Sequence, residues 1–324
     1  MSPIKFSLVT TCRNEMRSLR RWKENILAQT RPPDEIVVVD AFSDDGTAEN
    51  LFKWRAEDKR LVVIQEKGAA AHGRNVAIEH AKYEHILSTD MGIRLAPVWC
   101  EELIKPFESD PTVEVVAGNT QIDQETLKTA VARAAYYVAN GGLSKLETGF
   151  VIGNRSSAYL KRVWRELGGL PEDLTFYADD SVFGRQILQA GYKMAFAPKA
   201  MTYWARHTRL KDYWKETRGY GIGDGEAYIK TPAAFRLYRK KLLPAFMVPP
   251  LTAFRLFARQ IPRISYWLVL KKMDLIALAY IPPLILGNGW HFAKGYLLGY
   301  KRGETACRSC RSRIAHNPQE DKSV

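Results

Sequence analysis

Apolar and polar positions along roughly the first 100 residues predict strands and helices in turn. Residues 36–39, IVVV, are β-branched and continuously apolar, the pattern of a strand that is buried on both faces of a parallel sheet. We predict strands at residues 4–11, 35–40, 61–65 and 83–89, with helices at 18–29, 47–57 and around 74–81. Strands and helices in this order form right-handed βαβ units, so the pattern predicts an α/β fold.

The pattern is less regular after the fourth strand. Residues 113–119 predict a further strand, and residues 180–190 predict a helix. Residues 193–197 predict a short strand that ends at Pro198. Glycines at 141–142, 153 and 168–169 mark turns between these elements.

From residue 231 onward, apolar runs alternate with basic and aromatic residues. A bilayer core needs about 20 apolar residues, whereas the longest clean run, residues 275–286, has 12. We therefore do not expect a simple spanning helix. Two interpretations stay open: helices that lie in the lipid headgroup region, or a helical subdomain packed on the core of the α/β part. The interrupting prolines are Pro244, Pro249, Pro250, Pro282 and Pro283.

The net charge of +13 lies almost entirely in this last part. Residues 231–324 carry 16 Lys and Arg against 4 Asp and Glu, whereas residues 1–230 carry 32 against 31. Such an asymmetry indicates nucleic acid or an anionic membrane surface as a partner. The apolar runs broken by proline favour the membrane surface.

The four cysteines form no disulfide pattern, so we expect a reducing compartment. Cys307 and Cys310 could supply half of a zinc site, but no second pair of ligands follows at metal spacing. We expect no signal peptide, because the apolar run at residues 6–11 is short and soon meets Arg13.

Acidic residues recur where the predicted strands end. Asp40 ends the second strand in VVVDAFSDDGT, and Asp90 follows the fourth in LSTDMG. Parallel strands bring their carboxyl ends to one edge of the sheet, which is where ligands bind in open α/β folds. A later pair, Asp179 and Asp180, precedes a predicted helix. The alternatives are structural: a turn and N-cap cluster around Asp40, and acids that stabilise a helix N-terminus at the later pair.

Together these acids predict a pocket for a nucleotide diphosphate and a reacting hydroxyl. Asp90 suits a divalent cation on the diphosphate. Asp180 suits the base that takes the acceptor's proton, and the neighbouring charge of Asp179 would favour its protonation. The segment at residues 206–225 offers cationic groups and glycines for phosphates. Its candidates are His207, Arg209, Lys211, Arg218, Gly219, Gly221, Gly223 and Gly225.

Five ordered motifs carry a resemblance to a known family. They are SLVTTCRNE at 7–15, QTRPPDEIVVVDAFSDDGT at 29–47, GAAAHGRNVAIEHA at 68–81, STDMG at 88–92, and RSSAYLKRVWRELGGLPEDLTFYADDSVFGRQILQAGYK at 155–193. Over residues 4–225 the chain resembles the family-2 glycosyltransferases of the GT-A fold. The resemblance implies a Rossmann-like mixed, mostly parallel sheet flanked by helices. It also implies an inverting, single-displacement transfer of a sugar from a nucleotide-diphosphate sugar.

The resemblance also implies roles for individual residues. Asp180 would be the catalytic base, and Asp40 would contact the base or ribose of the nucleotide. Asp90 would hold Mg2+ or Mn2+, with His207 completing the metal or phosphate site. The other residues expected to bind the nucleotide sugar are Thr10, Asn14, Glu15, Asp45, Arg74, Asn75, Asp179, Arg209 and Arg218.

Two departures from the family pattern matter. The metal motif of the family is Asp-x-Asp, whereas here Ser88 occupies the first place and only Asp90 remains. A weaker metal site, or a water in place of the missing carboxylate, would follow. The Gln-x-x-Arg-Trp motif of processive synthases is absent, and TRGYG stands at residues 217–221. We therefore expect one sugar to be added per encounter.

The sequence thus predicts a catalytic domain at residues 1–230, a basic, apolar helical extension at 231–314 and a flexible tail at 315–324. We expect a hexosyltransferase that uses a UDP-linked donor, UDP being the commonest in the family. Its acceptor would be a glycan or lipid-linked hydroxyl in cell-envelope polysaccharide or glycolipid assembly. The expected location is the cytoplasm, peripheral at the cytoplasmic face of the membrane.

Three other functions predict different features. A dinucleotide oxidoreductase requires a glycine-rich turn after the first strand, and TTCRNE contains no glycine. A basic-tailed nucleic-acid-binding protein would bind DNA or RNA in a salt-sensitive way. A nucleotide-sugar-binding protein without efficient turnover would agree with Ser88, but the presence of Asp40, Asp90 and Asp180 argues against it.

Overall fold

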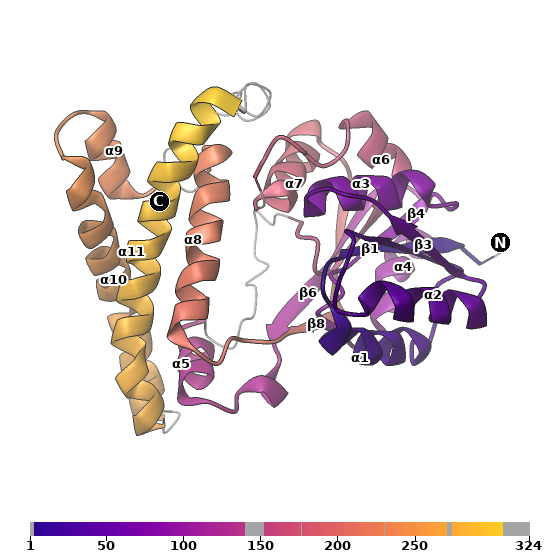
Figure 1. Cartoon of the computed structure of the whole chain (residues 1–324), viewed down its shortest axis with the longest axis horizontal. Coiled ribbons are helices and arrows are strands. Elements are labelled where there is room, and N and C mark those ends of the chain that lie inside the picture. Colours follow the sequence, from indigo (N-terminus) through magenta and orange to yellow (C-terminus); the bar gives the residue numbers. More distant parts are fainter. Residues whose placement is uncertain (1–2, 140–151, 176, 230, 271–273, 307–324) are drawn as a thin grey trace. The chain divides into compact units, whose positions relative to one another are not determined.

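A computed structural model describes residues 3–139, 152–175, 177–229, 231–270 and 274–306 of the chain (Figure 1). The chain forms two compact units, and each is described by itself. The first comprises Met1–Gln121, Ser144–Glu172 and Asp179–Ala205; the second comprises Ile122–Leu143, Asp173–Ala178 and Arg206–Val324. The predicted domain boundaries at residues 230 and 314 stay predictions. Cys307, Cys310 and the predicted tail at 315–324 lie outside the described residues.

An eight-stranded mixed sheet in the order β3-β2-β1-β4-β7-β6-β8-β5 forms the centre of the first unit. Strands β1, β2, β3 and β4 are mutually parallel, and β7 runs antiparallel to both β4 and β6. The predicted mixed α/β sheet is confirmed. The bounds are β1 Phe6–Cys12, β2 Glu35–Asp40, β3 Leu61–Gln65, β4 His85–Ser88, β5 Arg94–Leu95, β6 Val115–Ile122, β7 Ser157–Leu160 and β8 Met194–Trp204.

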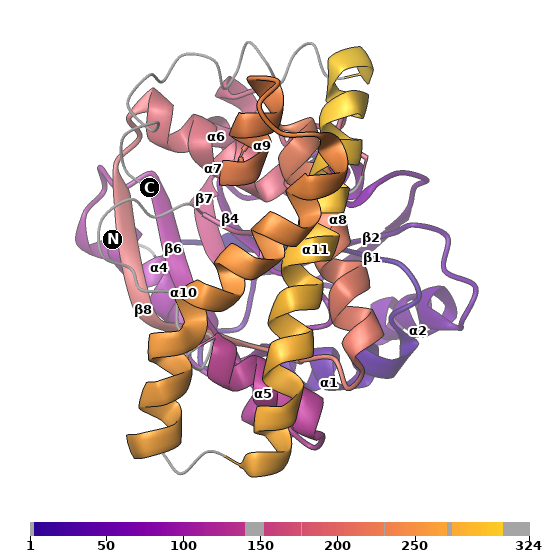
Figure 2. The ribbon, with the colours of Figure 1, turned by 90° about the vertical axis from the view of Figure 1, so that its left-hand side faces the viewer.

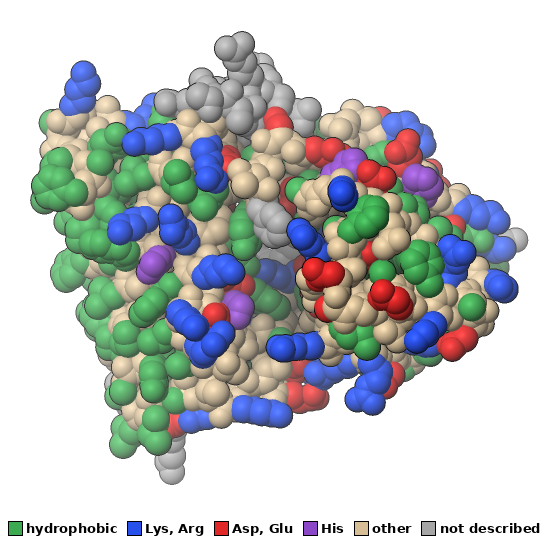
Figure 3. Space-filling view, in the orientation of Figure 1, with side chains coloured by type: hydrophobic (Ala, Val, Ile, Leu, Met, Phe, Trp, Pro, Cys, Tyr) green, Lys and Arg blue, Asp and Glu red, His purple; other side chains and the backbone are tan. Residues whose placement is uncertain are grey.

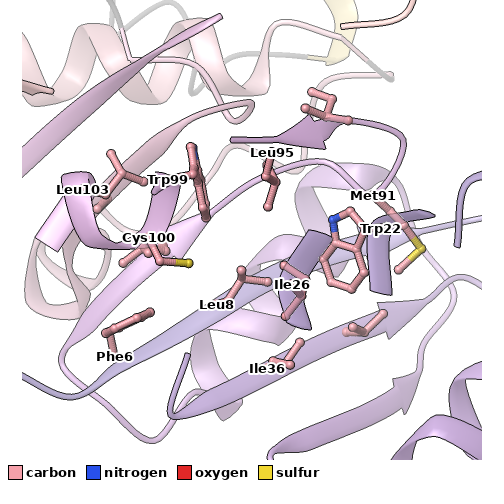
Figure 4. Close-up of a cluster of buried hydrophobic side chains, with 14 of the residues drawn as sticks. Phe6, Leu8, Trp22, Ile26, Ile36, Met91, Leu95, Trp99, Cys100 and Leu103 are labelled. Carbon is pink, nitrogen blue, oxygen red and sulfur yellow. The ribbon is translucent and has the colours of Figure 1, made fainter. Parts of the chain in front are cut away.

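Helices flank this sheet and bury both of its faces. Successive residues of β2 point to opposite faces, so Ile36 joins one apolar cluster and Val37 joins the other. Figure 4 shows the first cluster, to which β1 contributes Phe6 and Leu8, α1 contributes Trp22 and α4 contributes Trp99. The helices are α1 Met16–Leu27, α2 Thr47–Glu57, α3 Ala70–His80, α4 Trp99–Ser109, α6 Lys161–Glu166 and α7 Asp179–Ala190.

Strand β8 differs from its prediction. The strand expected to end at Pro198 continues to Trp204, so that expectation is wrong. Proline cannot donate a ladder hydrogen bond and is tolerated where no neighbouring strand needs one. The register between β5 and β8 pairs Arg94 with Tyr203 and Leu95 with Thr202, which lie beyond Pro198.

The second unit is helical. Its elements are η1 Gln124–Thr126, α5 Ala130–Val138, α8 Leu210–Glu226, α9 Ala233–Arg239, η3 Ala245–Met247, α10 Val248–Leu270 and α11 Leu275–Ala306. Figure 2 shows α8, α10 and α11 side by side.

Four of the five prolines expected to interrupt the apolar runs lie within helices, and Pro244 precedes the short helix η3. Pro249 and Pro250 stand in the first turn of α10, where a backbone N–H has no partner within the helix. Pro282 and Pro283 lie inside α11, which continues through them. By length and composition alone, the stretch Leu275–Gly303 of α11 could cross a membrane, with a mean hydropathy of 1.2 and 28% of its most apolar window buried.

The glycine-rich segment forms helix α8 from Leu210 onward. Two of its glycines face α11: a Cβ at Gly221 would lie 2.2 Å from the Phe292 carbonyl oxygen. A Cβ at Gly225 would lie 2.4 Å from the carbonyl oxygen of Tyr296. These glycines therefore allow two helices to approach closely, in place of the expected approach to a phosphate.

Candidate active site

The loops that follow β1, β2 and β4 leave the same edge of the sheet. The register pairs Cys12 with Asp40 and Val9 with Ser88, so these strands end side by side. Strand β7 enters at this edge, because Ser157 pairs with Ser88 in an antiparallel register. The sheet thus collects the predicted strand-end acids along one edge, as expected for a ligand site in an open α/β fold.

Arg74 of α3 joins two of the predicted site residues. Its Nη2 donates a 2.8 Å hydrogen bond to Oδ1 of Asp90, and its Nη1 donates a 2.7 Å bond to Oδ2 of Asp179. The side chains of Arg74 and Asp179 are each 11% exposed, whereas that of Asp90 is 37% exposed. Burial opposes the charge on Arg74, but the two carboxylates outweigh it and raise the pKa of the guanidinium above its usual value.

The acidic pair at the start of α7 is held from several sides. Asn154 donates from Nδ2 to Oδ2 of Asp179 at 3.2 Å, and from its backbone N–H to Oδ2 of Asp180 at 3.4 Å. The backbone N–H of Ser181 donates to Oδ1 of Asp180 at 2.7 Å. Burial raises the pKa of Asp179; Arg74 lowers it, and the charges of Asp180 and Asp90 raise it again.

The backbone before this pair adopts an uncommon conformation. Ala178 has a φ of 72°, in the left-handed region that favours glycine. Such a residue costs free energy and persists only when its surroundings hold it, often at functional sites. The turn fixes the direction in which α7 begins, and therefore where Asp179 and Asp180 lie.

Asp40 is fully buried and its carboxylate is already occupied. Oδ1 accepts hydrogen bonds from Oγ of Ser43 at 2.5 Å and from Sγ of Cys12 at 3.7 Å. Oδ2 accepts from the backbone N–H of Ser43 at 3.0 Å and from Nε2 of Gln65 at 3.2 Å. These bonds agree with the turn-forming alternative. The predicted contact between Asp40 and the base or ribose stays a prediction.

Asn14 and Asp45 join the loop after β1 to the loop after β2. Oδ1 of Asn14 accepts from the backbone N–H of Asp44 at 3.0 Å, and Asn14 has a φ of 58°. Oδ2 of Asp45 accepts from the backbone N–H of Met16 at 3.1 Å. Hydrogen bonds that the Thr47 hydroxyl and backbone N–H groups donate to Asp45 lower the pKa of its carboxyl group, which keeps the carboxylate charged.

Thr10 and Glu15 lie at the same edge. Thr10 is fully buried, and its Oγ1 has no hydrogen-bond partner among the described residues. Burial raises the pKa of Glu15; a hydrogen bond from Ser18 lowers it, and the charges of Asp90 and Asp45 raise it. A Cβ at Gly92, two residues after Asp90, would lie 3.6 Å from Oε2 of Glu15, so the Glu15 carboxylate lies beside the STDMG segment.

The predicted cation site has one carboxylate. Asp90 is the acid of the STDMG segment, while Ser88 is buried in β4 and hydrogen-bonds to Tyr159. The described residues contain no group of three or more His, Cys, Asp or Glu side chains that could hold a metal ion. A cation bound to a nucleotide needs one or two protein carboxylates together with the phosphates. The residues therefore fit a cation that arrives on a diphosphate and is held by Asp90, rather than a site built by protein alone.

Asn75 is saturated by protein groups. Its Oδ1 accepts from Nε1 of Trp164 and from the backbone N–H of Leu170, each at 2.9 Å. Its Nδ2 donates to the Leu170 carbonyl at 2.9 Å and to Oε1 of Glu172 at 2.7 Å. Asn75 thus ties α3 to the segment after α6, and its predicted support of the donor stays a prediction.

The remaining predicted residues belong to the second unit. Nε2 of His207 lies 3.6 Å from Oε1 of Glu216, and Nε of Arg209 donates to Oδ2 of Asp212 at 2.8 Å. Arg218 is exposed on α8. Contacts of these three residues with a cation or with phosphates stay predictions.

Sequence reasoning missed Asn154 as a residue of the site. Its only signal was the Gly-Asn pair at 153–154, which indicated a turn. A Cβ at Gly153 would lie 3.4 Å from Oδ2 of Asp180, so the turn passes directly beside the acidic pair. Sequence alone also did not connect Arg74 with Asp179, which is 105 residues away.

Comparison with known proteins identifies the family. The model of the family described as "Glycosyl transferase family 2" matches residues 7–168, half of the chain. The chain belongs to glycosyl transferase family 2. It is therefore a glycosyltransferase, and the resemblance found in the sequence motifs is confirmed.

The curated relatives of this glycosyltransferase are longer proteins. The chain is 22% identical over 251 residues to the poly-beta-1,6-N-acetyl-D-glucosamine synthase of Staphylococcus aureus (strain COL), covering 75% of this chain and 59% of that protein. It is 20% identical over 233 residues to the synthase of the same name from Staphylococcus epidermidis, covering 69% and 55%. The chain thus spans less than two thirds of the length of these relatives.

Solved structures confirm the GT-A fold. The mannosyltransferase PcManGT from Pyrobaculum calidifontis, in complex with GDP-Man and Mn2+, gives a TM-score of 0.57 at 19% identity, covering 89% of this chain and 86% of that one. TarS from S. aureus in complex with UDP gives a TM-score of 0.50 at 16% identity, covering 92% and 90%.

Proposed function

We propose that this glycosyltransferase moves one hexosyl group from a nucleotide-diphosphate sugar, most simply a UDP-sugar, to an acceptor hydroxyl with inversion. The observation that carries the proposal is the position of Arg74, which holds the candidate cation ligand Asp90 and the acidic pair at Asp179 through one guanidinium. A donor diphosphate and an acceptor proton would thus be handled at one edge of the sheet. The solved structures of the same fold, one in complex with UDP and another with GDP-Man and Mn2+, support a nucleotide-sugar donor.

In this proposal Asp180 takes the proton of the acceptor hydroxyl. The acceptor oxygen forms a bond to the anomeric carbon as the bond from that carbon to the diphosphate breaks, and attack from the opposite face inverts the configuration. Asn154 and Ser181 orient the Asp180 carboxylate. When bound at Asp90, Mg2+ or Mn2+ would neutralise the charge of the leaving diphosphate.

The nucleoside would bind where the loops after β1 and β2 meet. Asn14 and Asp45 join these loops by hydrogen bonds. Asp40 holds the loop after β2 by accepting a hydrogen bond from the backbone N–H of Ser43. The buried hydroxyl of Thr10, which has no hydrogen-bond partner within the described part of the chain, is one polar group in this region. The hydrogen bonds of these side chains fix the two loops that would form the walls of a nucleoside pocket.

Cell-envelope polysaccharide or glycolipid assembly is the proposed setting, with a glycan or lipid-linked acceptor. Relatives named poly-beta-1,6-N-acetyl-D-glucosamine synthase support it, although the chain spans only part of their length. The second unit supports peripheral binding at the anionic cytoplasmic face of the membrane. Figure 3 shows hydrophobic side chains gathered along the edge where Figure 1 draws α9 and α10. The exposed apolar residues of this region include Leu237, Leu242, Phe246, Met247, Leu251 and Phe254.

The Asp180→Asn variant tests the catalytic proposal. An amide keeps the size of the side chain but cannot accept a proton, so we expect donor affinity within about threefold of wild type and turnover reduced by about 100-fold or more. Donor binding is measured by calorimetry with UDP-N-acetylglucosamine and Mn2+, and turnover by release of UDP.

The matched control is Asp110→Asn, which changes an exposed aspartate that pairs with Lys193. We expect this control to keep full turnover. Turnover of Asp180→Asn near that of Asp110→Asn would reject Asp180 as the base. UDP-glucose, GDP-mannose and dTDP-glucose are tested in parallel, because a different donor would change the substrate and leave the role of Asp180 intact.

A further inference from the structure

Asp90, the candidate cation ligand, already has a cationic partner. Nη2 of Arg74 lies 2.8 Å from Oδ1 of Asp90, and the Arg74 side chain is 11% exposed. A second bond, from Nη1 to Asp179 at 2.7 Å, holds the guanidinium in place. A buried guanidinium that donates hydrogen bonds to two carboxylates is held in one position. Arg74 therefore stays beside Asp90.

A divalent cation at Asp90 would meet two obstacles. Ser88 stands where the family has a second acid, so Asp90 offers one carboxylate. The guanidinium beside it repels the cation, and this repulsion is strong where side chains are shielded from water. Among the described residues, no group of three His, Cys, Asp or Glu side chains offers an alternative site.

A donor diphosphate removes both obstacles at once. Its oxygens supply the cation ligands that the protein lacks. The same oxygens are good acceptors for a guanidinium, because arginine forms strong charge-assisted hydrogen bonds with phosphate. Arg74 could therefore exchange its bond to Asp90 for a bond to phosphate while it keeps its bond to Asp179.

Resting on the proposed function, we infer that Arg74 is an internal counter-ion for Asp90 that makes cation binding depend on the donor diphosphate. Without a donor, Arg74 holds Asp90, and the cation binds weakly. With a donor, Nη2 of Arg74 moves to a phosphate oxygen and Asp90 holds the cation. Nη1 stays on Asp179 in both states, so the acidic pair at the start of α7 keeps its position. Arg74 acts here as a positioning residue.

The test measures Mn2+ binding to the full chain in the absence of any nucleotide, by electron paramagnetic resonance. We expect weak binding by wild type. The Arg74→Gln variant removes the positive charge and leaves Asp90, Asp179 and Asp180 together, so we expect its affinity for Mn2+ to rise by roughly 10-fold or more, within the usual range of coupling between sites. Addition of UDP should raise the Mn2+ affinity of wild type far more than that of Arg74→Gln, because only in wild type does the diphosphate draw a guanidinium away from Asp90.

Two further variants are the controls for the Mn2+ binding of Arg74→Gln. Arg60→Gln removes an arginine that forms a similar fork with Asp58, at the amino end of β3, and should leave Mn2+ binding unchanged. Arg74→Gln combined with Asp90→Asn should lose the gained site. If Arg74→Gln alone fails to fold, as judged by circular dichroism, Arg74→Gln with Asp179→Asn removes the unpaired buried acid and should still bind Mn2+ more tightly than wild type.

Nucleotide-free wild type that binds Mn2+ as tightly as Arg74→Gln would overturn the inference, as would a gain that persists without Asp90. The titration without nucleotide uses neither sugar donor nor acceptor. A failure of sugar transfer therefore leaves its result untouched, and an active enzyme whose Mn2+ affinity is independent of Arg74 would reject this inference alone.

Discussion

Asn75 shows how a single side chain can hold a helix of the candidate site in place. It lies next to Arg74 on α3, and all four of its hydrogen bonds go to Trp164, Leu170 and Glu172. These partners follow α3 by about 90 residues in the chain and fix the rotation of the helix. Because that rotation determines where the Arg74 guanidinium points, Asn75 helps to position Arg74.

The Asn75→Ala variant should be clearly less stable than wild type. It leaves the N–H groups of Trp164 and Leu170 and the Leu170 carbonyl without their partner, and each unsatisfied group costs about 1–3 kcal/mol. We expect the free energy of unfolding to fall by about 2–4 kcal/mol in urea titrations.

Asn50→Ala is the control, because Asn50 bonds to the Gly46 carbonyl and to the sulfur of Met16. We expect it to cost about 1 kcal/mol or less. Equal losses for the two variants would show that the bonds of Asn75 have no special weight.

Asp40 and Asp90 show what the sequence could and could not predict about individual residues. Both lie at the ends of buried strands, and the sequence correctly predicted that both lie at one edge of the sheet. Their surroundings differ because Asp40 meets Ser43 and Gln65, whereas Asp90 meets Arg74. These partners come from other elements, and side-chain geometry decides between them. The position of an acid at a strand end predicts where it lies in the fold. Its hydrogen-bond partners determine whether its carboxylate can still bind a ligand.

At the level of elements, strong periodicity was predicted well. The bounds of β2, α2 and β3 coincide with the predicted residues 35–40, 47–57 and 61–65. Each is a short segment in which the apolar pattern and the turn residues agree. Strand β7, residues Ser157–Leu160, was not predicted, because four residues give too short a pattern to distinguish strand from loop.

The glycines of α8 were expected to approach a phosphate, and their packing against another helix was not predicted. The glycines at the contact between α8 and α11 occur at intervals of four residues, at Gly221 and Gly225 in α8 and at Gly295, Gly299 and Gly303 in α11. This spacing places them on one face of each helix, where small residues let two backbones approach. The loss of helix propensity is offset by packing between the two helices, which a single segment of sequence does not reveal.

The Gly299→Ala variant tests this packing. A Cβ at Gly299 would lie 2.0 Å from the Ile222 carbonyl oxygen, so α8 and α11 must separate or bend. Overpacking costs about 1–3 kcal/mol or more, against a gain in helix propensity of about 1 kcal/mol. We expect a net loss of about 1–2 kcal/mol in unfolding free energy, measured by urea titration.

Gly92→Ala is the control in the first unit, where an added Cβ would meet the Glu15 carboxylate at an ordinary 3.6 Å. We expect little change in its stability. A Gly299→Ala protein as stable as wild type would mean that the helices do not depend on this close approach.

At the scale of the whole chain, charge and exposed apolar surface occur in the same part of the sequence. Residues 231–324 carry a net charge of +12, with 16 basic against 4 acidic residues. Phe246 in η3 is 76% exposed and Phe254 in α10 is 67% exposed, close in sequence to the exposed basic residues at 239–241 and 255. Nucleic acid would complement only the positive charge. An anionic lipid surface would complement the charge and also bury the exposed aromatic side chains.

Liposome flotation of the full chain tests the membrane proposal. We expect wild type to float with vesicles that contain anionic lipid and to float less with neutral vesicles or at high salt. Burying a phenylalanine is worth about 1.5–3 kcal/mol, so Phe246→Glu with Phe254→Glu should lower the partition coefficient by about 10-fold or more.

The control is Phe196→Glu, which changes an exposed phenylalanine on β8 of the first unit and should leave flotation unchanged. Equal flotation of the double variant and wild type would reject η3 and α10 as the binding surface.

Extraction with alkaline carbonate then shows whether α11 crosses the bilayer. A peripheral protein is released from the vesicles, whereas a helix that crosses the bilayer keeps the chain in the pellet. Release of wild type together with loss of binding in the double variant would mean that electrostatic attraction and shallow aromatic insertion hold the enzyme at the surface, where a lipid-linked acceptor would be presented.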